Sequence, residues 1–409
     1  MSDFYQTDVI TTLHRLGGDG LDRIEHELAG FSKSRPATLV LPALYSEFEA
    51  DALRGIVEEL KRVRYIKEIV LSLGRASDEE FEKAMKFMSD IPYDVKIIHN
   101  EGKRIKALYS TLEDYGLWAG EDGKGRSAWL AYGYTIASGR SDVIALHDCD
   151  IVNYNREMLA RLCYPVMNPN IDVVFCKGFY SRVTDRMHGR VTRLLITPLV
   201  RALQKLVGGH DFLSFLDDFR YPLSGEFCMI TDLAWVNRIP WDWGLEVGVL
   251  SEVFRNYSAK RVCQVDITDN YEHKHQDLSP EDESRGLMKM CVDISKSIFR
   301  VLAAEGVVFS DNFFKSLEVG YLRLAEDTMV KYEADAAING LVYDRHGEAK
   351  AVEAFIRAIH KGAAAVLENP MGTPLIPSWR RVSAGIPGVL DFLRDAVDED
   401  NRVGRVLSS

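Results

Sequence analysis

The first 150 residues alternate between short apolar runs and amphipathic stretches, and this alternation constrains the fold more than any other feature. Apolar runs that predict strands lie at 37–44, 66–74, 93–100 and 141–150. Helical periodicity lies at 47–63, 78–88 and 127–138. Strands and helices that alternate at this spacing form a parallel sheet joined by right-handed crossovers. We therefore expect an α/β fold whose ligands bind at the carboxyl ends of the strands.

Beyond residue 150 the alternation loosens, and the chain ends in a helical region. Strands are expected at 171–180, 222–230 and 261–275, and helices at 189–207 and 241–257. The segment 101–125 is polar, and we assign no helix or strand to it. The expected divisions are a helical leader over 1–36, an α/β domain over 37–283, a helical C-terminal region over 284–397 and a frayed polar tail over 398–409.

Composition and short motifs exclude several classes of protein. Lys and Arg number 50 against 61 Asp and Glu, a net charge of −11, which disfavours a nucleic-acid binder because such proteins need a basic surface. The chain has no apolar signal-peptide core and no run of about 18 apolar residues, so we expect a cytoplasmic protein without a membrane span. No two of the six cysteines are spaced as CxxC. No GxGxxG follows the first strand and no GxxxxGK[ST] occurs, which disfavours a dinucleotide fold or a P-loop.

The most informative short motif is HDCDIVN at 147–153, which begins within the last residues of the fourth predicted strand. Asp148 and Asp150 are two positions apart, so both carboxylates can point into one cleft. Mg²⁺ binds one or two protein carboxylates together with ligand phosphates. A metal there would neutralise the charge that develops on a diphosphate leaving group. The alternative is that the two acids form a turn or cap a helix.

Three further motifs contain a charged residue beside glycine or apolar neighbours. Lys124 lies between two glycines in EDGKGRS, where the backbone can approach a ligand, although a flexible surface loop is the alternative. Glu226 follows Ser–Gly in PLSGEFCMI and could accept sugar hydroxyls, or could be a surface residue of a tight turn. Glu246 lies among apolar residues in WDWGLEVGVL, where an acid is rarely placed for packing, although pairing with a cation is the alternative.

Two other segments suit metal or anion binding. His273 and His275 alternate in NYEHKHQ, so only one of them would face a cleft and complete a metal site; a surface loop is the alternative for each. HGRVTRL at 188–194 places Arg190 at a predicted helix start, where its guanidinium and backbone donors could hold a phosphate or carboxylate. The alternative is simply a positively charged first helical turn.

Each motif is weak alone, but their order along residues 37–280 is specific. LPALYSE, GKG, DCD, GRVTRLLITPL, PLSGE, GLEVGVL and EHKH follow one another in that order. This set resembles the glucosyl-3-phosphoglycerate synthases and the similar mannosyl-3-phosphoglycerate synthases, retaining glycosyltransferases with the GT-A fold. The resemblance therefore implies a GT-A domain, with the C-terminal helices outside the matched segment.

The resemblance also implies a role for individual residues. The donor nucleotide sugar would be bound by Pro42, Ala43, Leu44, Glu47, Ser72, Lys124, Asp148, Cys149 and Glu226. The acceptor would be bound by Gly189, Arg190, Thr192 and His275, and the metal by Asp150 and His273. Catalysis would involve Asp150, Glu246 and the backbone carbonyl of Leu223, with Glu246 orienting the sugar rather than attacking it.

The reaction implied by the resemblance transfers glucose from UDP- or GDP-glucose to the C2 hydroxyl of 3-phosphoglycerate, with Mg²⁺ or Mn²⁺. Its product would serve a compatible-solute glucosylglycerate pathway or a methylglucose polysaccharide pathway, and the enzyme is expected to be a homodimer. The alternatives are a mannosyl-3-phosphoglycerate synthase using GDP-mannose, a glycerate acceptor, a sugar nucleotidyltransferase and a non-catalytic nucleotide-sugar binding module.

The chain departs from the family pattern at three positions. Ser72 stands where an acid is frequent, at the donor base. Tyr271 stands where Arg is frequent and His275 where Asn is frequent, both near the expected acceptor. Acceptor recognition is therefore the part of the family pattern that this chain alters most.

Overall fold

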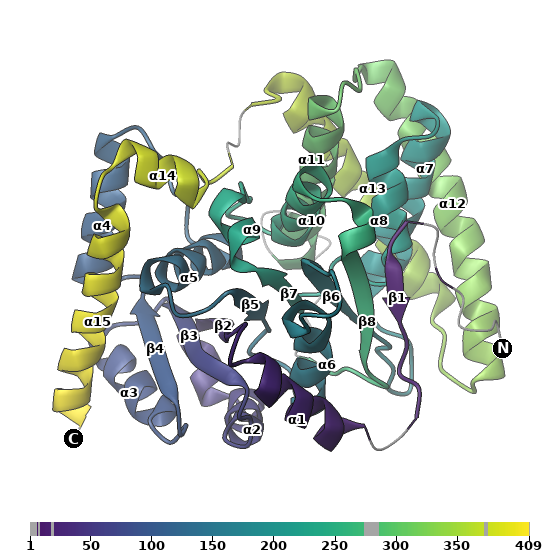
Figure 1. The fold of residues 1–409 in the computed structure, drawn as a ribbon. Helices are drawn as coiled ribbons and strands as arrows, with labels where there is room; N and C mark the ends of the chain where they lie inside the picture. Colours follow the sequence, from purple (N-terminus) through teal and green to yellow (C-terminus); the bar gives the residue numbers. More distant parts are fainter. Residues whose placement is uncertain (1–5, 7–8, 18–19, 274–285, 372–374, 409) are drawn as a thin grey trace.

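The computed structural model describes residue 6 and residues 9–17, 20–273, 286–371 and 375–408. The described residues form an eight-stranded sheet with helices against both faces (Figure 1). In spatial order the strands are β1 (Thr11–Leu13), β8 (Val262–Thr268), β6 (Phe175–Tyr180), β7 (Phe227–Ile230), β5 (Val143–Leu146), β2 (Ala37–Leu44), β3 (Ile66–Gly74) and β4 (Asp94–His99). The prediction of an α/β fold is confirmed.

The direction of one strand brings two distant motifs together. All described strands run in one direction except β7, which lies antiparallel between β5 and β6. Leu146, at the end of β5, is paired with Phe227, at the start of β7. Residues 222–226 therefore lie beside Asp148, at the edge of the sheet where the other strands end.

Two hydrophobic cores lie on opposite faces of the sheet. One face is covered by α1 (Leu21–Phe31), α2 (Asp51–Leu60), α3 (Asp78–Met88) and α6 (Arg156–Met167). The other is covered by α4 (Lys103–Asp114), α5 (Lys124–Ser138), α7 (Thr197–Val207), α8 (Asp211–Asp218), α9 (Thr231–Val236) and α10 (Leu245–Asn256). Three short turns are η1 (Tyr45–Glu49), the π-helical η2 (Val191–Ile196) and η3 (Ala259–Arg261).

Prediction and structure agree best where apolar periodicity and end signals coincide. The strands at 37–44 and 66–74 and the helix at 78–88 have their predicted bounds. Ser77 caps α3 through the Glu80 amide, and the Glu80 side chain completes a capping box. Gly139 ends α5 with φ 61°, the left-handed conformation that glycine adopts without a steric penalty.

Several elements differ from the prediction. β1 lies within the leader that we expected to be helical, because it finds a parallel partner in β8, which is far along the chain. α4 occupies about half of the polar segment 101–125, and its buried residues Ile105, Leu108 and Leu112 have a helical spacing that the surrounding charges obscured. The helices α6, α8 and α9 were not predicted.

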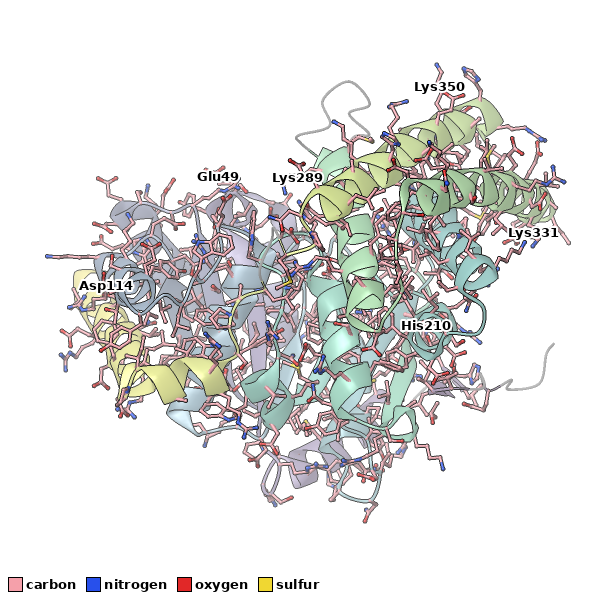
Figure 2. All side chains as sticks on the ribbon, turned by 90° about the horizontal axis from the view of Figure 1, so that it is seen from above. Glu49, Asp114, His210, Lys289, Lys331 and Lys350 are labelled. Carbon is pink, nitrogen blue, oxygen red and sulfur yellow. The ribbon has the colours of Figure 1, made fainter. Side chains whose placement is uncertain are left out.

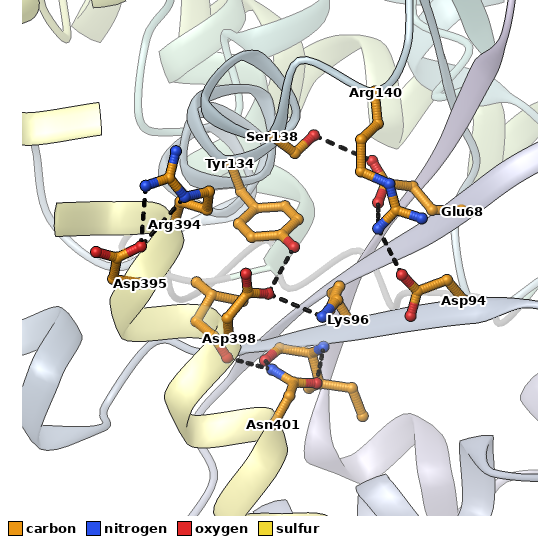
Figure 3. A network of polar contacts seen from close by, with 12 residues as sticks. Glu68, Asp94, Lys96, Tyr134, Ser138, Arg140, Arg394, Asp395, Asp398 and Asn401 are labelled. Carbon is orange, nitrogen blue, oxygen red and sulfur yellow. Dashed lines mark hydrogen bonds and ion pairs between the residues drawn. The ribbon is translucent and has the colours of Figure 1, made fainter. Parts of the chain in front are cut away.

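The C-terminal helix covers the β4 edge of the sheet, so the expectation of a frayed tail after 397 is wrong. α15 (Val389–Ser408) packs beside β4 (Figure 3). The Asn401 side chain accepts from the Ile97 amide at 2.9 Å and donates to the Ile97 carbonyl at 2.8 Å, as a neighbouring strand would. Asp398 accepts from Tyr134 at 2.9 Å and pairs with Lys96 at 2.8 Å. These contacts hold α15 against β4 and α5.

The other C-terminal helices form a lobe at the opposite side, where Lys331 and Lys350 mark its surface (Figure 2). They are α11 (Gly286–Ala304), α12 (Asp311–Ile338) and α13 (Arg345–Glu368), and α14 (Trp379–Gly385) precedes α15. Between α13 and α14 the chain returns across the α/β part, where the Ile376 amide donates to the Ile239 carbonyl at 3.0 Å. The helical C-terminal region is confirmed, whereas the boundary at 283/284 and the homodimer stay predictions. Among the described helices, none combines the length and the apolar character needed to cross a membrane.

Replacing Asn401 with alanine should destabilise the fold without an effect on the cavity described below. The change leaves the buried Ile97 amide and carbonyl without their partners. We expect the free energy of unfolding to fall by about 2–3 kcal/mol in urea titrations. Asn339→Ala, at an exposed residue after α12, is the matched control and should change it by less than about 1 kcal/mol. Equal effects of the two variants would contradict the role given to Asn401.

Candidate active site

A cavity of about 480 Å³ opens at the edge of the sheet where β5 and β6 end and β7 begins. Eight of the residues singled out in the sequence are among those that line it: Lys124, Asp148, Gly189, Arg190, Thr192, Leu223, Glu246 and His273. Others are not among its described lining residues: Pro42, Ala43, Leu44, Glu47, Ser72, Cys149, Asp150 and Glu226. His275 lies outside the described residues.

A partly buried ion cluster forms one end of the cavity. Lys124, the first residue of α5, places its Nζ 2.6 Å from Asp148 Oδ1 and 3.0 Å from Glu246 Oε1. Burial alone would lower the pKa of the Lys124 ammonium, but the charges of Asp148 and Glu246 hold it well above its usual range. Burial raises the pKa of Asp148 to about 6, and nearby carboxylates add to the rise against the attraction of Lys124. Raised pKa values for both an acid and a base indicate a surplus of negative charge.

Glycines allow the segments that carry these groups to approach closely. A Cβ on Gly125 would lie 2.0 Å from the Pro240 carbonyl oxygen, which is too close for any other residue. A Cβ on Gly225 would lie 2.3 Å from Asp148 Oδ2. The glycines of the GKG and SGE motifs are therefore needed for the close packing of the segments that carry the ion cluster. Glu246 lies in the first turn of α10, where the helix dipole favours an acid.

Asp150 and His273 meet beside this cluster. Asp150 Oδ2 and His273 Nδ1 are 3.3 Å apart, and a bridge between Ile151 and His273 aligns their segments. Burial would raise the pKa of Asp150, but the hydrogen bond and the charge of His273 lower it. No group of three His, Cys, Asp or Glu side chains among the described residues could hold a metal ion. The pair could supply two ligands of a cation that a bound phosphate completes.

Glu226 lies beneath the cavity and supports its floor. Its carboxylate is fully buried and accepts hydrogen bonds from Tyr180 at 2.8 Å, Tyr271 at 2.7 Å and Ser224 at 3.0 Å. Burial would raise the pKa of Glu226, but His147 and these hydroxyl groups lower it. Tyr180 and Tyr271 stack with ring centroids 3.8 Å apart, and both line the cavity. Tyr271, where the family frequently has Arg, is thus part of a stacked pair that the sequence did not reveal.

The opposite end of the cavity is basic. Gly189, with φ 74°, turns the chain before Arg190 and Thr192, and all three residues line this end; their role as an anion clamp stays a prediction. Arg182 and Arg186 line the same end and were missed. Their signal was the repeated arginine at 182, 186, 190 and 193, which spans the loop after β6 and the start of η2. π-Helical turns are rare in proteins, and those that do occur are frequently found at functional sites.

The residues expected at the donor base lie at the ends of β2 and β3, away from this cavity. Leu44 is exposed at the end of β2, and Ser72 is buried, donating to Asn100 Oδ1 at 3.0 Å. Cys149 is buried, and burial holds the pKa of its thiol well above the usual range. Asp122 pairs at 3.0 Å with Arg75, the residue directly after β3, and was not singled out from the sequence. A role for this edge in binding the base stays a prediction.

Lys177 is a fully buried cation that the sequence analysis missed. Its Nζ donates to the Ser224 carbonyl at 2.7 Å and lies 5.3 Å from the centre of the Phe227 ring. Lys177 occurs in FCKGFY, which predicts only an apolar strand, so no signal marked it. By holding Ser224, it fixes the segment between Leu223 and Gly225, two residues that line the cavity.

Comparison with known proteins identifies the relatives of this chain. No protein-family model matches it. A glucosyl-3-phosphoglycerate synthase from Persephonella marina is 51% identical over 401 residues, which cover 98% of this chain and 99% of that protein. A second one, from Methanococcoides burtonii, is 37% identical over 403 residues, covering 97% and 98%.

Solved structures resemble the fold at lower identity. A glucosyl-3-phosphoglycerate synthase from Mycobacterium tuberculosis, in complex with Mg²⁺ and UDP, is 22% identical, with a TM-score of 0.52 over 74% of this chain and 88% of that one. The same enzyme was solved with Mn²⁺, UDP-glucose and phosphoglyceric acid, at 21% identity and a TM-score of 0.52 over 74% and 89%. A mannosyl-3-phosphoglycerate synthase from Rubrobacter xylanophilus is 22% identical, with a TM-score of 0.53 over 70% and 80%. The expected GT-A fold is thereby confirmed.

Replacing Lys177 with methionine should change how stability depends on pH. Burial lowers the pKa of Lys177 from 10.5 to about 8, so the folded protein loses this proton at lower pH than the unfolded chain. Between these values the unfolded state binds more protons, and stability from this group rises with pH. We expect the free energy of unfolding of the wild type, relative to Lys177→Met, to rise by roughly 3 kcal/mol from pH 8 to 10.5 in urea titrations. A difference that does not vary with pH would contradict this expectation, and Lys205→Met, at an exposed residue of α7, controls for the loss of a lysine.

Proposed function

The chain belongs to the glucosyl-3-phosphoglycerate synthase family and is a glycosyltransferase, and from that premise we propose that it transfers glucose from a nucleoside diphosphate glucose to the C2 hydroxyl of 3-phosphoglycerate. The observation that carries the proposal is a single cavity with two chemically different ends. One end contains Lys124 between two carboxylates, and the other contains arginines around Arg190. A diphosphate sugar suits the first end, and a small anionic acceptor suits the second.

The donor diphosphate is placed against Lys124, Asp150 and His273. The Lys124 ammonium has three protons and donates two of them to Asp148 and Glu246, so the third can be donated to a phosphate oxygen. Four carboxylates in this region face two ammonium groups, a surplus that fits a divalent cation: Asp148, Asp150, Glu226 and Glu246 against Lys124 and Lys177. Mg²⁺ or Mn²⁺, held by Asp150 and His273, would neutralise the diphosphate as its bond to the sugar breaks.

The sugar is placed between Leu223 and Glu246. No described residue donates a hydrogen bond to the Leu223 carbonyl, which lines the cavity and can accept one from the sugar or the acceptor. Glu246, held at 3.0 Å by Lys124, can accept from sugar hydroxyls and orient the ring. The C2 hydroxyl attacks the anomeric carbon on the side from which the phosphate leaves, and the departing phosphate oxygen takes its proton. Glu246 therefore positions the sugar without forming a bond to it.

The acceptor is placed against the basic end. Arg190 and the hydroxyl of Thr192 are suited to hold the phosphate, with the turn at Gly189 exposing backbone donors. Arg182 adds positive charge that suits the carboxylate of 3-phosphoglycerate, whereas Arg186 is paired with Asp185 at 2.9 Å. This end needs no cation, because its own side chains supply the positive charge.

Glucose is proposed rather than mannose because the relatives at 51% and 37% identity, which span nearly the whole chain, are glucosyl enzymes. The mannosyl alternative has the support of a likeness in fold at 22% identity. The proposal includes both UDP and GDP as the nucleotide, since the residues predicted to contact the base lie at the ends of β2 and β3, outside the cavity.

Substrate identity can be tested with a panel of nucleotide sugars. UDP-glucose, GDP-glucose, ADP-glucose and GDP-mannose would each be offered with 3-phosphoglycerate or glycerate and Mg²⁺, reading release of the nucleoside diphosphate. We expect turnover with at least one glucose donor and with 3-phosphoglycerate. Turnover with GDP-mannose alone would support the mannosyl alternative, and no turnover with any pair would contradict the proposal.

Replacing Asp150 with alanine should abolish most transfer while the fold persists. The change removes one of the two proposed cation ligands, so we expect turnover to fall by about 100-fold or more. Mn²⁺ binding in the presence of UDP, measured by calorimetry, should weaken in parallel. Asp172→Ala, which removes an exposed carboxylate that pairs with Arg261 at 2.7 Å, is the control and should retain both properties. Turnover retained by Asp150→Ala would rule out the proposed metal ligand.

A further inference from the structure

The C-terminal lobe contacts the loop that forms the basic end of the cavity. Glu348 lies in the first turn of α13, and its side chain is 5% exposed. Its Oε1 accepts from Arg190 Nε at 2.7 Å, and its Oε2 accepts from Arg193 at 3.0 Å. One buried carboxylate from the C-terminal region therefore binds two arginines of the acceptor loop, by which we mean residues 182–193 at the basic end of the cavity.

The two arginines use this carboxylate differently. Arg190 donates from Nε, and no described residue accepts a hydrogen bond from its terminal nitrogens. Its side chain is 36% exposed and lines the cavity. Arg193 is buried, and its Nε donates to the His188 carbonyl at 2.9 Å. Glu348 thus fixes the Nε side of one guanidinium that lines the cavity and, through the other, holds the turn that precedes Arg190.

Further contacts from the lobe stabilise the π-helical turn η2. The Tyr321 hydroxyl of α12 donates to the Leu194 carbonyl at 2.7 Å. The Arg193 guanidinium lies 4.8 Å from the centre of the Tyr332 ring, also on α12. The Val342 amide, between α12 and α13, donates to the Asp185 carbonyl at 2.8 Å. The loop that carries the acceptor residues is therefore held along its length by the C-terminal helices.

Glu348 compensates only part of the positive charge of the two arginines. Two guanidinium groups share one carboxylate, so the cluster keeps a net positive charge, and the exposed part of it belongs to Arg190. A guanidinium with Nε fixed presents its terminal nitrogens in one orientation, which suits bidentate binding of a phosphate. Without the carboxylate, Arg190 would carry the same charge on a freely rotating side chain.

We infer that Glu348 is a positioning residue for the acceptor, acting through Arg190 and Arg193. This inference rests on the proposed function, because it takes the acceptor to be an anion held by Arg190. It gives the C-terminal lobe, which lies outside the motif set, a part in acceptor recognition. Glu348 does not touch the acceptor itself, since its two oxygens are occupied by the arginines.

The inference is tested by Glu348→Gln, with KM and kcat measured for both substrates. A positioning role predicts that KM for 3-phosphoglycerate rises about 10-fold or more while KM for the donor stays within about twofold. The dissociation constant of 3-phosphoglycerate, measured by calorimetry without donor, should rise to a similar extent. If Glu348 served only to offset charge, the variant would gain net positive charge and KM for the acceptor would fall, which would overturn the inference.

Glu318→Gln provides a matched control. Glu318 lies on α12 and pairs with His360 of α13 at 2.9 Å, so it also links the helices of the lobe but is away from the acceptor loop. This control should retain both KM values. Equal changes in the two variants, or equal rises in both KM values of Glu348→Gln, would indicate a general loss of structure and overturn the inference.

A second variant covers the case in which Glu348→Gln does not fold. Glu348→Asp keeps the charge but is one methylene shorter, so it cannot reach both arginines, and KM for the acceptor should again rise selectively. Failure of the proposed function is distinguishable, because the wild type would then show no turnover with 3-phosphoglycerate. Wild-type turnover with an unchanged acceptor KM in a folded Glu348 variant would contradict this inference alone.

Discussion

The close approach of two glycine-bearing segments to their neighbours is the constraint on which the site depends. Gly125 rests on the Pro240 carbonyl and Gly225 on the Asp148 carboxylate, with no room for a side chain at either contact. These contacts place the Lys124 ammonium between Asp148 and Glu246. The three residues come from three different parts of the chain. Removing one member of this partly buried ion group would leave an uncompensated charge, so each segment must be in place for the others to be tolerated.

The segment after Ile239 connects this ion cluster to the C-terminal region. The Asp242 carboxylate, 2% exposed, pairs with Lys296 of α11 at 3.3 Å and accepts from the Gly244 amide at 2.9 Å, just before Glu246. The Ile239 carbonyl binds the chain that returns from α13 toward α14. The C-terminal helices thus support the ion-cluster end of the cavity through Asp242 and the arginine end through Glu348. A region that composition and motifs left without a role is in contact with both halves of the cavity.

Sequence reasoning succeeded where a signal is local. The bounds of β2, β3 and α3 followed from apolar periodicity and a capping residue, and the acids at 148 and 150 follow a strand that was recognised as buried. It failed where the deciding contact comes from far along the chain. β1 is a strand because β8 lies beside it, and the buried Lys177 is stabilised in the core by the hydrogen bond that it donates to the Ser224 carbonyl. No pattern near Glu348 indicates that two arginines lie opposite it.

Charge distribution explains how an acidic chain can bind two anions. The net charge of −11 describes the whole molecule, but the two ends of the cavity have opposite local surpluses. At the proposed donor end, carboxylates outnumber ammonium groups, so a diphosphate would be repelled unless a divalent cation accompanied it. At the proposed acceptor end, Arg190 and Arg193 share Glu348, and the remaining positive charge would attract an anion directly. On the proposed assignment, electrostatics would therefore separate the two substrates, because an acceptor that arrives without a cation would be disfavoured at the first end and favoured at the arginines.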